Sequence, residues 1–115
     1  MEATKMKTAM VIQPMNGLSE EQILYARADA IKQIEGNGYA VADTYFRDGL
    51  IVPPGVKNVP LYYLARSLQF MASCDAVYLC KGWENARGCK IEHAAAIAYG
   101  LEIHGYELTC CGDAS

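Results

Sequence analysis

In the second half of the chain, one continuous stretch reads as a buried strand, a loop and a helix in direct succession. Residues 74–80 are apolar apart from one Asp, residues 81–87 contain Gly, Trp and Arg, and residues 88–99 are rich in Ala. A short apolar strand that leads into a helix is typical of β-α-β units, which form parallel sheets covered by helices. In open α/β sheets, ligands bind where the carboxyl ends of strands meet helix N-termini. The stretch therefore constrains both the fold class and the position of a site.

The same alternation extends over the rest of the 115-residue chain. Short apolar runs predict strands at residues 8–12, 39–42, 76–80 and 101–103, and helical patterns lie between them at residues 19–36, 60–71 and 88–99. The order β-α-β-α-β-α-β predicts an α/β fold of three layers, a parallel sheet of four to five strands with helices on both faces. The length predicts a single domain over residues 1–115.

Local signals set the expected helix ends and inner faces. Ser19 and Gln22 have the spacing of a capping box, Gly36-Asn37-Gly38 suits the end of that helix, and Pro60 suits the first turn of the next one. Helical spacing predicts that the first helix buries Ile23, Ala26, Ala30 and Ile34, and that the second buries Leu61, Leu64, Leu68 and Met71.

Composition excludes several classes of function. The net charge is −3 and no basic run is present, which argues against nucleic-acid binding. No apolar run reaches the roughly 18 residues that a membrane span requires. The five cysteines are odd in number and form no Cys-x-x-Cys pair, which favours free thiols and a cytoplasmic location. The spacing of Cys80, Cys89 and His93 matches no common zinc site, so neither a metal nor another cofactor is expected.

Three residues near the start of the last predicted helix are candidates for a site. Glu92 lies close to the helix N-terminus, where the helix dipole favours an ionised carboxylate that suits a nucleophile, although a solvated first-turn glutamate is the alternative. Trp83 and Arg87 in the preceding loop combine an aromatic face with a guanidinium, which suits a planar base or a phosphate. The alternative is that Trp83 is a hydrophobic lid and Arg87 a surface charge.

Other candidates follow the first two predicted strands. The turn Gln13-Pro14-Met15-Asn16-Gly17 precedes a capped helix, so its amides suit a phosphate or a ribose, but it has neither a dinucleotide fingerprint nor a P-loop lysine. Asp43 and Tyr45 follow the second strand and are well placed to meet a ligand. Asp75 precedes a strand, so we expect it to serve as a turn or cap residue at the opposite end of the sheet. His93 is expected to be structural.

Two of these segments resemble those of nucleoside 2-deoxyribosyltransferase-like proteins, in particular the small bacterial and phage members. The turn from Gln13 to Gly17 resembles their Gly-Pro-Met type turn, and Gly88-Cys89-Lys90-Ile91-Glu92 resembles their Gly-x-x-x-Glu signature. The resemblance covers residues 8–103. It implies a flavodoxin/Rossmann-like sheet, a homo-oligomer and N-glycosidic chemistry, in which Glu92 attacks the anomeric carbon of a nucleoside or nucleotide. The ligand-binding residues that it implies are those of the turn, Asp43, Tyr45, Gly82, Trp83, Arg87 and Gly88.

The chain departs from the active enzymes at one place. They tend to carry an aspartate at the end of the strand before the signature, whereas this chain has Lys81-Gly82. Two hypotheses therefore stay open beside a nucleoside or nucleotide N-glycosidase or deoxyribosyltransferase. One is a catalytically inactive protein that senses or sequesters a nucleotide, and the other is an interaction domain without a ligand.

Overall fold

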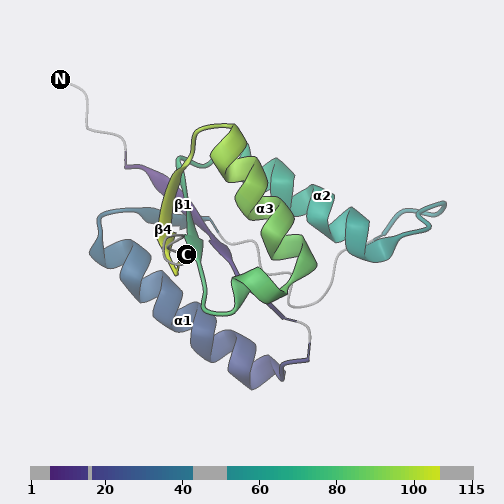
Figure 1. Cartoon of the computed structure of the whole chain (residues 1–115), viewed down its shortest axis with the longest axis horizontal. Helices are drawn as coiled ribbons and strands as arrows, with labels where there is room; N and C mark the ends of the chain where they lie inside the picture. The colour runs from purple at the N-terminus through teal and green to yellow at the C-terminus, as the bar shows by residue number, and fades with distance from the viewer. Residues whose placement is uncertain (1–5, 16, 43–51, 107–115) are drawn as a thin grey trace, which may run out of the picture.

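The computed structural model describes residues 6–15, 17–42 and 52–106 (Figure 1). Within these residues, the elements in chain order are β1 (Thr8–Ile12), α1 (Glu20–Gly36), β2 (Ala40–Ala42), α2 (Val59–Met71), β3 (Ala76–Leu79), the short 3-10 helix η1 (Trp83–Asn85), α3 (Arg87–Ala98) and β4 (Glu102–Gly105). The strands form one parallel sheet in the order β2-β1-β3-β4. Helix α1 lies on one face, and α2 and α3 lie on the other (Figure 1). The protein thus has the flavodoxin/Rossmann-like α/β fold that was predicted.

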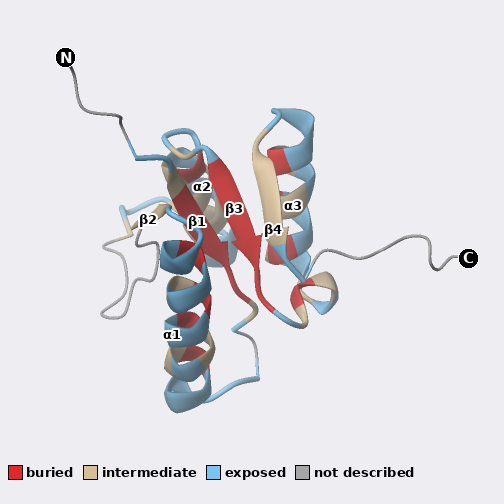
Figure 2. Cartoon of the chain, turned by 90° about the vertical axis from the view of Figure 1, so that its left-hand side faces the viewer, coloured by how far each residue is buried: buried red, intermediate tan, exposed pale blue. Residues whose placement is uncertain are grey.

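The two central strands are buried on both faces of the sheet (Figure 2). On the face toward α2 and α3, the core contains Met10, Ile12, Met71, Val77, Leu79, Trp83, Cys89 and Ala96. On the face toward α1, it contains Ala9, Val11, Ala30, Ile34, Ala76, Tyr78 and Cys80. A strand buried on both faces cannot alternate apolar and polar residues, which explains why β1 and β3 read as continuous apolar runs.

The local signals in the sequence predicted the helix ends well. The Ser19 hydroxyl accepts a hydrogen bond from the Gln22 amide at 3.1 Å, and the Gln22 side chain accepts one from the Ser19 amide at 2.9 Å. This confirms the capping box. Asn58 caps α2 by accepting from the amide of Leu61 at 3.0 Å, and Pro60 occupies the first turn. The predicted ends of α3 differ by one residue, because α3 begins at Arg87 and ends at Ala98.

Two predictions of buried helix faces were partly wrong. Leu61 is 58% exposed because it lies in the first turn of α2, whereas the core is reached by Met71 and, in part, Leu68 near the other end. On α1, the predicted Ile23, Ala30 and Ile34 are buried, but the predicted Ala26 is only half-buried and its neighbour Arg27 is buried. An arginine therefore occupies a position on the inner face of α1.

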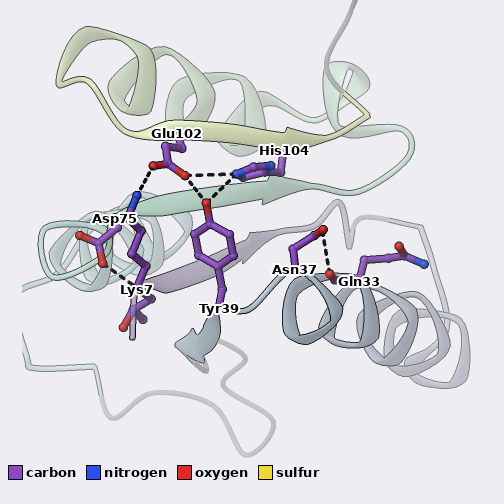
Figure 3. A network of polar contacts seen from close by, with 8 residues as sticks. Lys7, Gln33, Asn37, Tyr39, Asp75, Glu102 and His104 are labelled. Atoms are coloured by element: carbon purple, nitrogen blue, oxygen red, sulfur yellow. Dashed lines mark hydrogen bonds and ion pairs between the residues drawn. The ribbon is translucent and has the colours of Figure 1, made fainter. Parts of the chain in front are cut away.

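A polar network closes the amino end of the sheet (Figure 3). The Glu102 carboxylate pairs with the Lys7 ammonium at 2.7 Å and accepts a hydrogen bond from the Tyr39 hydroxyl. The His104 ring lies 3.2 Å from the Tyr39 hydroxyl oxygen and 3.4 Å from the carboxylate. Asp75 accepts from the Thr8 amide at 2.9 Å, so it lies at the amino end as predicted, but it bonds the start of the neighbouring strand instead of capping a turn or a helix. The network thus links the starts of all the described strands.

Candidate functional site

A cleft of about 830 Å³ opens at the carboxyl ends of β1 and β3. Its lining comes from the turn after β1, the inner side of α1, the part of α2 from Pro60 to Ser67, the connection between β3 and α3, and the start of α3. Neighbouring strands β1 and β3 lead into helices on opposite faces of the sheet, so their connections diverge and leave a crevice. The cleft therefore lies where the sequence predicted a site.

Glu92 lies at the buried side of this cleft. It is only 9% exposed, although it is a carboxylic acid, and it lies in the second turn of α3. Burial raises the pKa of the Glu92 carboxyl to about 7, and a hydrogen bond with the Ser67 side chain of α2 acts in the opposite direction. A solvated first-turn glutamate would show neither property. Glu92 can therefore exchange a proton near neutral pH and can present a partly desolvated carboxylate to a ligand.

The turn after β1 forms the opposite wall. Gln13, Pro14 and Met15 all line the cleft. The Gln13 side-chain nitrogen donates to the Ile23 carbonyl at 2.5 Å, which fixes the orientation of the amide because a carbonyl can only accept. Gly17 has a φ of +80° and lies outside the lining, and Asn16 lies outside the described residues.

The connection between β3 and α3 contributes the polar rim. Lys81 and Gly82 of this connection line the cleft, together with Arg87 and Gly88 in the first turn of α3. Gly82 has a φ of +88°, and a Cβ at this position would lie 3.7 Å from Cγ of Pro14. That distance is an ordinary van der Waals contact, so it is the left-handed backbone, and not a lack of space, that favours glycine at this position. The predicted positions Gly82, Arg87 and Gly88 are brought together with Glu92, Gln13, Pro14 and Met15.

Trp83 does not line the cleft. It is 3% exposed and belongs to the core, where its ring packs on His93 with 4.4 Å between centroids. Its indole nitrogen donates to the Tyr106 carbonyl at 2.6 Å. The turn of η1 directs the ring inward, and this hydrogen bond satisfies the only polar group of the indole. Trp83 therefore supports the loop from beneath instead of facing a ligand.

The polar cleft residues that the sequence did not single out include Arg27 and Ser67, and Lys81 was noted only as the residue in place of an expected aspartate. Arg27 is 5% exposed and comes from the inner face of α1. One signal was available, because Arg27 lies four residues after Ile23 and three before Ala30, which is the spacing of the buried face. Ser67 gave no signal, since its role depends on the packing of α2 against α3. Asp43 and Tyr45 lie outside the described residues.

The buried thiols are poor nucleophiles and poor metal ligands. Burial raises the pKa of Cys80 to about 11 and that of Cys89 to about 12, so both thiols are protonated at neutral pH. Among the residues that the structure describes, no group of three or more His, Cys, Asp or Glu side chains could hold a metal ion. The carboxyl of Glu92 is therefore the reactive group to consider first.

Comparison with known proteins assigns the chain to a family. Residues 8–105 match the family described as "Domain of unknown function (DUF4406)", and the protein belongs to this family. Searches of curated proteins and of solved structures found no match to the chain. In the described part of the chain, no helix is long and apolar enough to cross a membrane.

Proposed function

We propose that this protein cleaves the N-glycosidic bond of a nucleoside or nucleotide, with Glu92 as the nucleophile. One observation carries the proposal: Glu92 is a buried carboxylic acid in a cleft at the carboxyl end of a parallel sheet. A buried acid without a structural ion pair is costly for the fold, and such groups cluster at functional sites. The resemblance to nucleoside 2-deoxyribosyltransferase-like proteins adds support, since Glu92 is the residue that matches their nucleophile.

The reaction proceeds in two displacements. In the first, a Glu92 carboxylate oxygen bonds to the anomeric carbon, and the bond to the base nitrogen breaks with both electrons moving to the base. A proton from the solvent or from a cleft residue neutralises the leaving base. In the second, water or another base attacks the same carbon and releases the carboxylate. Water gives hydrolysis, and a base gives transfer of the sugar.

The carboxylate form is required for attack, so the state of Glu92 sets the pH dependence. Its pKa of about 7 means that roughly half of the molecules are ready to react at neutral pH in the absence of ligand. We therefore expect kcat/KM to rise with pH and to level off above about 7.

The proposal is tested by incubating the pure protein with a panel of nucleosides and 5′-monophosphates and measuring free base by chromatography. Glu92→Gln removes the nucleophile but keeps the size of the side chain, so we expect a loss of at least ~10³-fold in turnover. The matched control is Glu84→Gln in η1, because Glu84 does not line the cleft. Turnover near the wild-type level in the Glu92 variant would refute the assignment.

A second candidate function is binding of a nucleotide without turnover. The observation that favours it is the lining itself: among the described cleft residues, Glu92 is the only acid, and Lys81 and Gly82 follow β3 where a second acid would assist the leaving base. This alternative predicts that a nucleotide raises the melting temperature although no base is released over hours.

The resemblance also supports a homo-oligomer, and we propose a second copy of this chain as the partner. A hollow of about 320 Å³ between α2 and α3 is lined by apolar side chains, including Met71 and Tyr99. Nearby, Ile97 is 52% exposed and Tyr99 is 84% exposed. Exposed apolar surface of this kind marks association sites. Size-exclusion chromatography with light scattering would reveal the mass in solution.

A further inference from the structure

One polar residue interrupts the inner face of α2 where this helix passes Glu92. The residues of α2 that face the cleft or the core recur at helical spacing, and they are Pro60, Tyr63, Leu64, Ser67, Leu68 and Met71. All of them except Ser67 have an apolar or aromatic body. Serine is a weaker helix former than alanine, so a hydroxyl at this inner position points to a specific partner.

The partner is the Glu92 carboxyl. Ser67 is half-buried and lines the same cleft as Glu92, and a hydrogen bond joins the two side chains across α2 and α3. A serine in a helix can instead bond the carbonyl of the preceding turn of its own helix. Here the hydroxyl reaches the neighbouring helix, so the packing of α2 on α3 determines how the acid is held.

The bond leaves one oxygen of Glu92 for a ligand. A carboxylate has two acceptor oxygens, whereas a hydroxyl group donates a single hydrogen. Ser67 is the hydrogen-bond partner that the described residues give to Glu92. Neither oxygen of Glu92 is among the buried side-chain atoms that lack a partner in the described part of the chain. The oxygen that Ser67 does not engage is therefore open to the cleft.

Charged and titratable side chains also line the cleft, on the elements that surround Glu92. They are Arg27 on α1, Tyr63 on α2, Lys81 after β3, and Arg87 and Cys89 on α3. The causes of the shifted pKa of Glu92 are nevertheless its burial, which raises the pKa, and the Ser67 bond, which lowers it. A hydrogen bond that lowers the pKa of an acid favours the ionised form, so the Ser67 hydroxyl donates to the carboxylate.

We propose that Ser67 is a positioning residue for Glu92: its hydroxyl holds one carboxylate oxygen and directs the other into the cleft for attack. A nucleophile that is already oriented loses less freedom on the way to the transition state. The role of Glu92 as the nucleophile rests on the proposed function, whereas the bond between the two side chains does not. Ser67 acts through Glu92 and forms no bond to the substrate.

The first test removes the hydroxyl and follows the charge of Glu92 directly. Carbon-13 NMR of the side-chain carboxyl carbons measures the pKa of Glu92, and Glu92→Gln identifies its signal. Ser67→Ala should raise this pKa by about one unit, the effect of one hydrogen bond to a charged group. Alanine is the best helix former, so this variant should keep α2 folded.

Two further variants separate the hydroxyl from the packing around it. Ser67→Thr keeps a hydroxyl group and should keep the wild-type pKa of Glu92. Ser73→Ala is the matched control, because Ser73 is exposed after the end of α2 and does not line the cleft. It should leave the pKa of Glu92 unchanged.

The same variants are then assayed for base release over a range of pH. In Ser67→Ala, the midpoint of the rise in kcat/KM with pH should move up by about one pH unit, so that kcat/KM falls ~10-fold at pH 6. A merely structural role of Ser67 would lower kcat/KM by the same factor at every pH and would leave the midpoint in place.

The outcomes separate this inference from the proposed function. If the pKa of Glu92 stays at the wild-type value in Ser67→Ala, or rises equally in Ser67→Thr, the inference is overturned, and base release by the wild type still supports the proposed function. If the wild type releases no base but the pKa rises in Ser67→Ala alone, the proposed function fails and the hold of Ser67 on Glu92 is supported. Base release with a midpoint that shifts in Ser67→Ala alone supports both.

Discussion

The two ends of the sheet treat their carboxylates in opposite ways. At the amino end, Glu102 is half-exposed and interacts with Lys7, Tyr39 and His104, which together lower its pKa to about 2, with the Lys7 contact first among the causes. At the carboxyl end, Glu92 is buried and its pKa is raised to about 7 by that burial. The amino end has the polar partners that its groups require. At the carboxyl end, Glu92 has a hydrogen bond with the Ser67 side chain that does not offset its burial, and Oε1 of Gln13 has no partner among the described residues.

This contrast indicates that the carboxyl end of the sheet is the end that binds a ligand. Glu102 loses little by folding, because its new partners replace water, so its role is complete within the chain. Glu92 and the Oε1 atom of Gln13 lose contacts with water without full replacement, which costs stability. A fold retains such groups where a ligand or a reaction uses them.

The largest expected effect comes from Gly105→Ala, which would detach β4 and with it the amino-end network. A Cβ at this position would lie 2.4 Å from the Leu79 carbonyl oxygen, and φ is +93°. Backbone cannot move aside cheaply, so we expect a loss of about 3 kcal/mol or more in the free energy of unfolding. Urea unfolding measures it, with the fluorescence of Trp83, the single tryptophan, as the probe.

Gly38→Ala is the matched control for this change. Gly38 has a similar φ of +89°, but no atom lies within 4 Å of a Cβ there. Gly38→Ala should lower the free energy of unfolding by about 1–2 kcal/mol, which is the strain of a left-handed backbone at a residue with a Cβ. If both variants lose the same free energy of unfolding, then the close approach of β4 to β3 does not depend on glycine at position 105.

The next effect concerns stability and pH at Glu92. Its pKa rises from 4.5 to about 7 on folding, so between these values the folded protein holds a proton that the unfolded chain has lost. The contribution of Glu92 to stability is fully present below pH 4.5 and is lost as pH rises through 7. We expect Glu92→Gln to be more stable than the wild type at pH 8, by up to ~3 kcal/mol, and about equal at pH 4.

Glu102→Gln serves as the opposite case in the same urea titration. Its pKa is lowered on folding, so its contribution is present above pH 4.5 and is lost as pH falls toward 2. This variant should be less stable than the wild type above pH 4.5 and about equally stable near pH 2, and the difference should shrink at high salt, because the pair is exposed. A loss of stability in Glu92→Gln at pH 8 would show that ionised Glu92 has stabilising partners.

The smallest expected effect concerns Gly88, in the cleft at the carboxyl end of the sheet. Gly88→Ala places a methyl group in the first turn of α3, where no described atom lies within 4 Å of the new Cβ. It should stabilise the fold by up to ~1 kcal/mol and raise KM, because Gly88 lines the cleft. Gly36→Ala, at the end of α1 with equally open surroundings, should leave KM unchanged. An unchanged KM in the Gly88 variant would place the ligand elsewhere.

Much of the site could be predicted because it depends on local features of the chain. The position of Glu92 follows from a strand, a loop and a helix in direct succession, and the turn from Gln13 to Met15 follows from the end of an apolar run. Strand ends and helix starts converge in any parallel sheet, so these residues were expected to meet. The place of Asp75 at the amino end followed from the same rule, because it precedes a strand.

Other features depend on which way a side chain turns. Trp83 lies between Lys81 and Arg87 in the chain, and both of these line the cleft. Its ring nevertheless lies in the core, because η1 directs it inward. The spacing of α1 placed Arg27 on the buried face, but its place in the lining of the cleft depends on how α1 packs on the sheet. These choices depend on packing between distant elements.

The sequence by itself determined the order of strands and helices, the capped start of α1, the place of Pro60 in the first turn of α2, and the end of the sheet at which Glu92 lies. Periodicity, capping residues and chain direction are local properties, so they can be read without knowing any contact. Only the tertiary structure decided that Glu92 is buried against Ser67, that Gln13 keeps an unsatisfied acceptor, and that three cations share the cleft with one acid. Burial and electrostatic fields are sums over residues far apart in the chain, and they exist only once the helices have packed on the sheet.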